Sequence, residues 1–156
     1  MNIILEFYNV GGFMHIHTST GQLILVIDKY FRLYFKKSLK EYGLTSAAGL
    51  VLLVVYGGGE KTQDEVIAEL HYDKGVMART MRLLDRKGYL IRRDNPNDNR
   101  SYIYETTTKA DEFIPVIIGY LKEWDKILTK EISEEEMKIT YKVLSKMVKN
   151  VSENKL

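Results

Sequence analysis

The stretch "DKGVMARTMRLLDRKGYLIRRDNPNDNRSYIYET" (residues 73–106) decides the fold, because a helix, a stop signal and two strands follow one another in it. Asp73 is a typical N-cap residue and Gly88 a typical helix stop, so the residues between them are predicted to be helical. "YLIRR" and "SYIYET" are rich in strand-forming residues and flank "DNPNDN", a turn that Pro96 stiffens. The stretch therefore predicts a helix followed by a β-hairpin.

The predicted helix has an apolar face and a second face of small and basic residues. The apolar face, spaced i, i+3, i+4 and i+7, consists of Met77, Thr80, Met81 and Leu84. The second face carries Gly75, Ala78, Arg79, Arg82 and Arg86. One face is thus suited to a core, and the other to a polyanion.

Each residue type near the second face fits a contact that DNA offers. Small residues let the backbone approach base edges, and Val76 or Ala78 can touch a thymine methyl group. Arg79 can donate two hydrogen bonds to guanine O6 and N7. The cations suited to phosphates are Lys74, Arg82 and Arg86.

The distribution of charge supports a nucleic-acid face more strongly than the total charge does. Residues 74–100 hold eight basic and three acidic side chains, a net charge of +5, whereas the whole chain is only +2. The remainder is therefore net −3, and such asymmetry is expected of a DNA-binding protein. The alternative, a solvated helix with stabilising i,i+4 pairs, does not fit Arg82 and Arg86, which repel each other.

The residues upstream complete a recognisable arrangement. Thr62 is predicted to cap a short helix, "QDEVIAEL", in a capping box with Glu65. Two short helices joined by "HY" and followed by a hairpin make a winged helix-turn-helix, whose second helix enters the major groove. Thr62 and Gln63, at the start of the first of these helices, join the candidate DNA-binding residues.

Asp98 and Arg100 lie at the tip of the hairpin and belong to the same candidate set. Residues two apart on a strand point to the same side, so Asp98 is predicted to orient the Arg100 guanidinium. Arg100 would then enter a narrow, strongly negative minor groove. The alternative is a surface salt bridge worth at most about 1 kcal/mol.

Together, "DKGVMARTMRLLDRKGYLIRR" and "DNPNDNRSYIYETTTKA" resemble the MarR family of winged-helix transcriptional regulators. The resemblance implies a homodimer with two winged-helix lobes that reads a pseudo-palindromic operator. It also implies, for many members, release from DNA by a small phenolic or other anionic aromatic effector. Gly75 and Val76 replace polar residues common in the family at the start of this helix, so the resemblance carries no operator sequence.

The outer parts of the chain fit the same plan. We expect a mainly α fold with a small β-hairpin wing: an N-terminal arm (1–18), dimerisation helices (19–44 and 108–156) and a DNA-binding lobe (45–107). Capping boxes at Ser19–Gln22 and Ser133–Glu136 open the long outer helices. Their apolar faces are predicted to meet a second copy, and the alternative is a monomeric helical bundle.

Composition excludes several classes of function. The absence of cysteine removes disulfides, thiolate metal sites and cysteine redox sensing. The longest apolar run has ten residues, against the roughly 20 of a bilayer-spanning helix, and the N-terminus lacks a basic segment typical of a signal peptide. His15, His17 and His71 are a weak metal-ligand pattern without an accompanying acid or cysteine cluster. No Ser/His/Asp set suggests catalysis, so we expect no enzyme activity, metal or cofactor.

Aromatic residues on the first outer helix leave two interpretations open. Tyr30, Phe31 and Tyr34 are candidates for an aromatic effector pocket, and the interpretation that we favour for them is a dimer core. Taken together, the sequence predicts a cytoplasmic, homodimeric, DNA-binding transcriptional repressor. The first rival is a winged-helix module for protein contacts in a transcription complex, and the second is an enzyme or small-molecule-binding protein built on a helical bundle.

Overall fold

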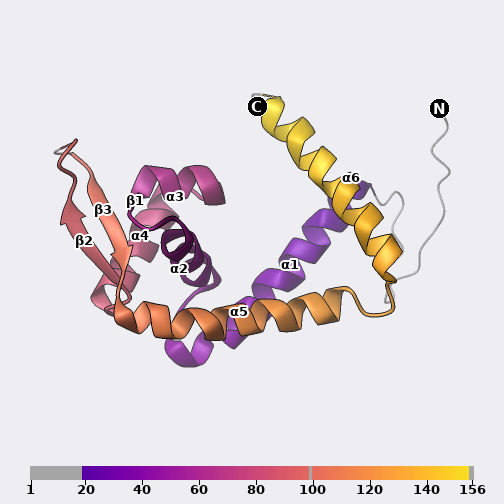
Figure 1. Cartoon of the computed structure of the whole chain (residues 1–156), viewed down its shortest axis with the longest axis horizontal. Helices are drawn as coiled ribbons and strands as arrows, with labels where there is room; N and C mark the ends of the chain where they lie inside the picture. The colour runs from indigo at the N-terminus through magenta and orange to yellow at the C-terminus, as the bar shows by residue number, and fades with distance from the viewer. Residues whose placement is uncertain (1–18, 99, 155–156) are drawn as a thin grey trace. The chain divides into compact units, whose positions relative to one another are not determined.

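The computed structural model describes residues 19–98 and 100–154, which fall into two compact units divided between Ile117 and Ile118. The predicted N-terminal arm, with His15 and His17, lies outside the described residues. The first unit contains α1 (Thr20–Ser38), a short 3-10 helix η1 (Lys40–Tyr42), α2 (Ser46–Gly58), β1 (Lys61–Thr62), α3 (Gln63–Leu70), α4 (Lys74–Arg86), β2 (Leu90–Asp94), β3 (Tyr102–Thr106) and the start of α5 (Thr108–Leu128) (Figure 1). The second unit contains the rest of α5 and α6 (Glu134–Glu153).

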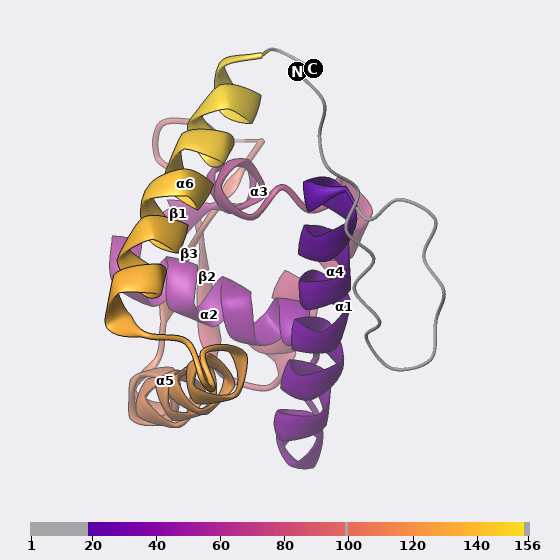
Figure 2. The same ribbon diagram turned by 90° about the vertical axis from the view of Figure 1, so that its right-hand side faces the viewer.

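The core of the first unit is built around α2, which packs against α3, α4 and β3 and lies beside α1 (Figure 2). Its apolar sequence predicted burial, and Val51, Leu52 and Val55 are indeed fully buried. A side chain at Gly49 would meet Leu39 at 2.7 Å and the Phe35 ring at 2.9 Å. Glycine there is what allows α1 and α2 to approach so closely.

The first helix is shorter than the spacing predicted. The spacing of apolar residues after the Ser19 cap predicts one helix as far as a C-cap at Gly43, but α1 ends at Ser38 and the chain tightens into η1. The reason is that the N–H groups of Tyr42 and Gly43 bond to carbonyls three residues back, at 3.2 and 3.0 Å. Gly43 then takes a left-handed φ of 62° and ends the segment.

The helix-turn-helix forms at the residues that the local signals indicated. The Thr62 hydroxyl accepts the Glu65 N–H, and the Glu65 side chain accepts the Thr62 N–H, so the capping box is confirmed. The Asp73 carboxylate accepts the N–H groups of Gly75 and Val76 at 2.8 and 3.1 Å and opens α4. These caps satisfy backbone donors that each helix start would otherwise leave without acceptors.

The sheet has three strands in the order β1-β3-β2, one more than the predicted hairpin. β2 and β3 pair antiparallel from Leu90↔Thr106 to Asp94↔Tyr102, which confirms the wing. β1 adds only Lys61↔Tyr104 and Thr62↔Ile103 on the other edge of β3. The prediction missed β1 because two residues between a glycine run and a helix cap carry no strand periodicity.

The second unit is helical, and its apolar side chains are mostly exposed. α6 begins at the predicted Ser133–Glu136 capping box, which is confirmed. The apolar face expected for this helix consists of Met137, Tyr141, Leu144 and Val148, and Val148 is 65% exposed. Within residues 19–98 and 100–154, no helix combines the length and hydropathy that a bilayer span requires.

Candidate nucleic-acid interface

The two faces of α4 lie as the sequence predicted. Met77, Met81 and Leu84 are fully buried, and Thr80 is 6% exposed. The Thr80 hydroxyl donates to the Val76 carbonyl at 2.9 Å, so this polar group is satisfied inside the core. The opposite side presents Arg79, Arg82 and Arg86, all exposed, with Gly75 and Ala78 half-buried beside them.

Gly75 shapes the start of this exposed side. A nitrogen of the Arg79 guanidinium lies 3.5 Å from the point that a Cβ on Gly75 would occupy. The guanidinium therefore extends back over the first turn of α4, where larger side chains would hinder it. Gly75 and Arg79 thus form one surface on which a base edge can approach the helix backbone.

The remaining candidates from α3 and the start of α4 lie near this surface but are engaged locally. The Thr62 hydroxyl is used in the α3 capping box, and Gln63, the first residue of α3, is half-buried. Lys74 forms an ion pair with Asp64 at 3.4 Å, with both side chains largely exposed. Such an exposed pair is weak enough for a phosphate to compete with it.

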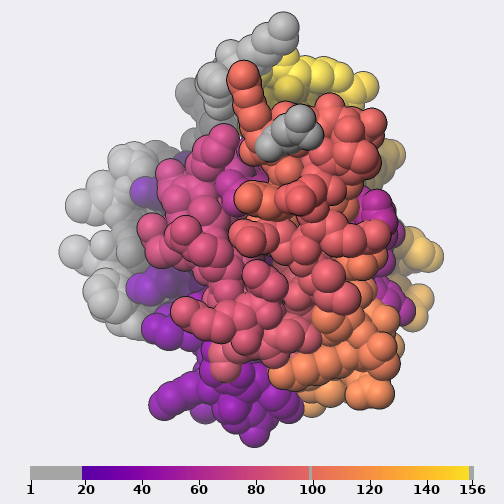
Figure 3. All heavy atoms as spheres, turned by 90° about the vertical axis from the view of Figure 1, so that its left-hand side faces the viewer, coloured from indigo at the N-terminus to yellow at the C-terminus, as the bar shows by residue number. Residues whose placement is uncertain are grey.

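The eight cations of residues 74–100 divide into two groups. Four are engaged within the chain: Lys74 with Asp64, Lys87 with the Tyr42 carbonyl, Arg92 over the Tyr102 ring, and Arg93 with Glu60 and Glu105. The other four make no ion pair within the described part of the chain: Arg79, Arg82, Arg86 and Arg100. The space-filling view shows α4 and the β2–β3 hairpin exposed on the same face (Figure 3).

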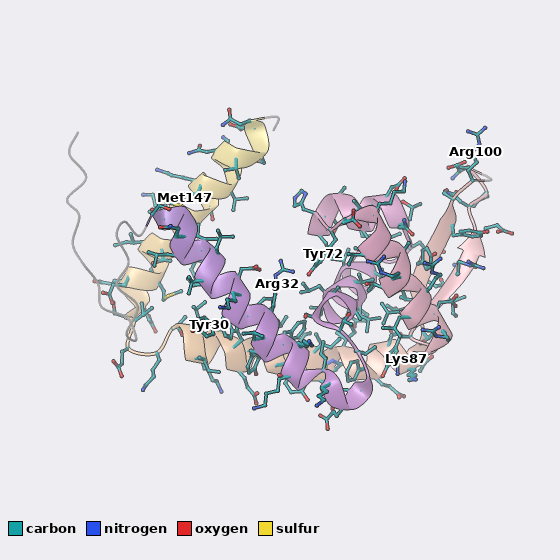
Figure 4. The ribbon with its side chains drawn as sticks, turned by 180° about the vertical axis from the view of Figure 1, so that it is seen from behind. Tyr30, Arg32, Tyr72, Lys87, Arg100 and Met147 are labelled. Atoms are coloured by element: carbon teal, nitrogen blue, oxygen red, sulfur yellow. The ribbon has the colours of Figure 1, made fainter. Side chains whose placement is uncertain are left out.

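The tip of the wing corrects one prediction. The Asp98 carboxylate accepts the backbone N–H of Arg100 at 3.0 Å, and no ion pair joins it to the Arg100 guanidinium. The prediction assumed strand geometry, but both residues lie in the turn between β2 and β3. Asp98 therefore shapes the turn backbone, and Arg100 extends outward from the tip (Figure 4).

A second set of contacts holds Arg92 of β2. The Arg92 guanidinium carbon lies 4.3 Å from the centre of the Tyr102 ring. Burial raises the pKa of Tyr104, and the neighbouring Arg92 opposes that rise. No sequence pattern marked Arg92 as a candidate residue. In the β2–β3 hairpin it lies opposite Tyr104.

A surface pocket of about 300 Å³ opens in the first unit beside α4. It is lined by Arg32, Thr45, Ser46, Ala47, Tyr72, Val76, Arg79, Thr80 and Leu83. Arg32 of α1 and Tyr72 of the α3–α4 connection point toward each other (Figure 4), and an Arg32 guanidinium nitrogen donates to the Tyr72 hydroxyl at 3.1 Å. Arg32 also pairs with Asp28 at 2.7 Å, and that hydrogen bond raises the pKa of Arg32.

The three aromatic residues predicted for an effector pocket are not among those lining it. Tyr30 is 58% exposed on α1. Phe31 stacks on Phe35 with ring centres 5.3 Å apart, and Tyr34 is half-buried. Sequence reasoning missed Arg32 and Tyr72 because they are 40 residues apart and no local pattern links them.

His71, the one described histidine, has a structural position. It takes a left-handed φ of 53° and ends α3, where its N–H donates to the Ile67 carbonyl at 2.8 Å. Across residues 19–98 and 100–154, no group of three or more His, Cys, Asp or Glu side chains is arranged to hold a metal ion.

Comparisons with known proteins agree with this architecture. A family model described as MarR family matches residues 42–101, from η1 to the tip of the wing. The HTH-type transcriptional regulator BilQ of Clostridioides difficile (strain CD3) is 31% identical over 122 residues, which cover 78% of this chain and 82% of the relative.

Solved structures extend the likeness to the whole fold. The crystal structure of MarR is 28% identical, with a TM-score of 0.83, and the match covers 91% of this chain and 97% of that one. A MarR family regulator from Listeria monocytogenes, solved with a 26-mer DNA, shares the fold at 20% identity and a TM-score of 0.81, over 88% of this chain and 92% of that one. The relative, the family match over the helix-turn-helix and β2, and the shared fold agree, and the chain belongs to the MarR family of transcriptional regulators.

Proposed function

We propose that this chain is a homodimeric repressor that binds a pseudo-palindromic DNA site through α4 and the wing. The observation that carries the proposal is the exposed set of Arg79, Arg82, Arg86 and Arg100, which make no ion pair within the described residues. Cations without internal carboxylates are available to phosphates and to guanine. The two copies of α4 would enter successive major grooves about 34 Å apart, with each Arg100 in a flanking minor groove.

The exposed apolar faces of the outer helices support the dimer. Leu23, Leu25 and Leu33 of α1 are each more than half exposed, as are Tyr141 and Val148 of α6. Large apolar side chains that are exposed in such numbers on one helix are typical of a protein–protein interface. We therefore assign the segments 19–44 and 108–156 to dimerisation, and the segment 45–107 to DNA binding.

The pocket beside α4 supports control by a small aromatic anion. Its volume of about 300 Å³ lies at the lower end of the range of ligand sites. Arg32 and Arg79 can pair with an anionic group, and Tyr72 can stack on a ring. Because Arg79 lines the pocket and also belongs to the exposed face of α4, a ligand held there would compete with DNA for that side chain.

The test is selection of bound duplexes from a random pool by the full-length protein at low salt. We expect an enriched inverted repeat, and a mobility shift on it that weakens steeply as salt rises. Failure to enrich any sequence would refute the proposal and favour a winged helix used for protein contacts. Adding salicylate-like aromatics to the shift assay tests the effector, which should reduce the fraction of DNA bound.

A substitution separates the DNA-binding face from a generic charge effect. Arg79→Ala should lower affinity for the selected duplex about tenfold, since a bidentate guanine contact discriminates by roughly 1–3 kcal/mol. The matched control, Lys138→Ala, removes an exposed cation of α6 and should leave binding within about twofold. An Arg79→Ala variant that binds as tightly as the wild type would remove Arg79 from the interface.

A further inference from the structure

Arg93 of β2 joins β3 to the segment immediately before β1. One guanidinium nitrogen donates to Glu60 at 2.5 Å and to Glu105 at 2.6 Å. Arg93 lies on β2, Glu105 on the middle strand β3, and Glu60 immediately before β1. The side chain therefore crosses the middle strand and ties one edge of the sheet to the other.

The strand register explains why a cation is needed at this point. Lys61 pairs with Tyr104, so continuing the antiparallel register by one residue sets Glu60 opposite Glu105. Like charges directly opposite on neighbouring strands destabilise a sheet. Arg93 reverses this effect, because both carboxylates accept hydrogen bonds from the same nitrogen.

The cluster of Glu60, Arg93 and Glu105 lies where the wing meets the segment that leads into α3. β1 pairs with β3 over only two residues, so few backbone hydrogen bonds fix the β2–β3 hairpin to the segment that leads into α3. Glu60 belongs to that segment, two residues before the Thr62 cap. The Glu60–Arg93–Glu105 cluster thus adds a side-chain connection between the wing and the helix-turn-helix.

We propose that Arg93, held by Glu60 and Glu105, is a positioning residue that sets the direction of the wing and thereby DNA affinity, without itself contacting DNA. The cluster carries two negative charges against one positive charge, so it does not attract phosphates. The inference rests on the proposed DNA-binding function. It removes Arg93 from the basic footprint that the charge count of residues 74–100 suggested.

The sharpest test is a variant for which a positioning role and a simple charge effect predict opposite changes in DNA affinity. The double variant Glu60→Ala/Glu105→Ala makes each chain more positive by two charges and releases Arg93. If the cluster is only surface charge, this variant binds the selected duplex more tightly. If the cluster positions the wing, the variant binds at least about threefold more weakly, a loss within the range that exposed ion pairs contribute.

A matched control separates the effect of losing the cluster from the effect of removing two negative charges. Glu112→Ala/Glu135→Ala removes two exposed acids from α5 and α6, which form no ion pair with the other described residues. We expect this control to bind the duplex as tightly as the wild type or more tightly. Hydroxyl-radical footprinting should show that the Glu60/Glu105 variant loses flanking minor-groove protection while central protection persists, which a general loss of folding would not produce.

The salt dependence of Arg93→Ala distinguishes positioning from direct contact. We expect weaker binding with the wild-type slope of log affinity against log salt, whereas Arg82→Ala should flatten the slope by about 0.9 for each phosphate that the protein no longer neutralises. A flattened slope for Arg93→Ala would overturn the inference, as would unchanged or tighter binding by the Glu60/Glu105 variant. If the wild type selects no DNA, it is instead the proposed function that fails.

Discussion

At the scale of single residues, the wing tip illustrates how a short polar side chain organises a turn. Besides the Asp98 contact with Arg100, the Asn95 side chain accepts the Asn97 N–H at 3.0 Å and donates to the Ser101 hydroxyl at 2.9 Å. Side chains of Asn and Asp that bond to nearby backbone groups stabilise turns in this way. The outward direction of Arg100 therefore depends on turn geometry rather than on a charge partner.

This geometry leads to a prediction about Asp98. Asp98→Asn keeps an oxygen acceptor for the Arg100 N–H and removes a negative charge, so affinity for the selected duplex should equal or exceed that of the wild type. Asp98→Ala removes the acceptor and should weaken binding severalfold, approaching the loss expected for Arg100→Ala. Mobility-shift titrations measure all three. Binding by Asp98→Asn that is as weak as binding by Asp98→Ala would show that the charge of Asp98, and not its acceptor oxygen, supports the complex.

At the scale of elements, the N-caps Thr62 and Asp73 determine where α3 and α4 begin. α3 has only eight residues, too few to be stable alone, so its capping box contributes a large share of its local stability. The hydrogen bonds from Thr62 lower the pKa of Glu65. That stabilisation is present above the ordinary glutamate pKa of about 4.3 and is lost as pH falls through the lower folded-state value.

Two substitutions test this cap. Thr62→Ala should reduce the free energy of unfolding at neutral pH by about 1 kcal/mol, the usual effect of losing an N-cap side chain. Glu65→Gln should flatten the acid limb of the stability profile, because the titrating group is gone. Urea unfolding between about pH 3 and 7 measures both effects. An acid limb identical to that of the wild type in Glu65→Gln would exclude a contribution from this carboxylate.

The helix caps could be predicted from the sequence, whereas the contacts within the sheet could not. The caps at Ser19, Thr62 and Ser133 depend on contacts three residues apart, so local patterns sufficed to predict them. The core face of α4 followed from helical periodicity. The contact between Glu60 and Arg93 spans 33 residues, and β1 exists only through its pairing with β3. Such features depend on the assembled sheet, and no window of sequence contains them.

At the scale of the whole molecule, the chain carries more apolar surface on its outer helices than a solitary protein needs. Within α6, the apolar stripe includes Tyr141, Leu144 and Val148, each at least 40% exposed. The first turn of the same helix is acidic and its far side carries lysines, as in a helix with one face against a partner. A second copy is the partner that the proposed pseudo-palindromic site requires.

Val148→Glu tests that proposal at the most exposed residue of the α6 stripe. A carboxylate placed in an apolar interface loses hydration without gaining a counter-charge, so the dimer should dissociate at micromolar concentration. Asn150→Glu is the matched control: it adds the same charge about 200° round the helix and should remain dimeric. Size-exclusion chromatography with light scattering reports the mass of each variant.

The consequence for DNA binding follows from the same substitution. A monomer engages one half-site and loses the gain in effective concentration that links two lobes, so Val148→Glu should bind the full inverted repeat about 100-fold more weakly than the wild type. Its affinity for an isolated half-site should stay close to that of a wild-type lobe, because α4 and the wing are untouched. A Val148→Glu variant that is monomeric yet binds the full site with wild-type affinity would separate dimerisation from recognition and refute the two-lobe arrangement.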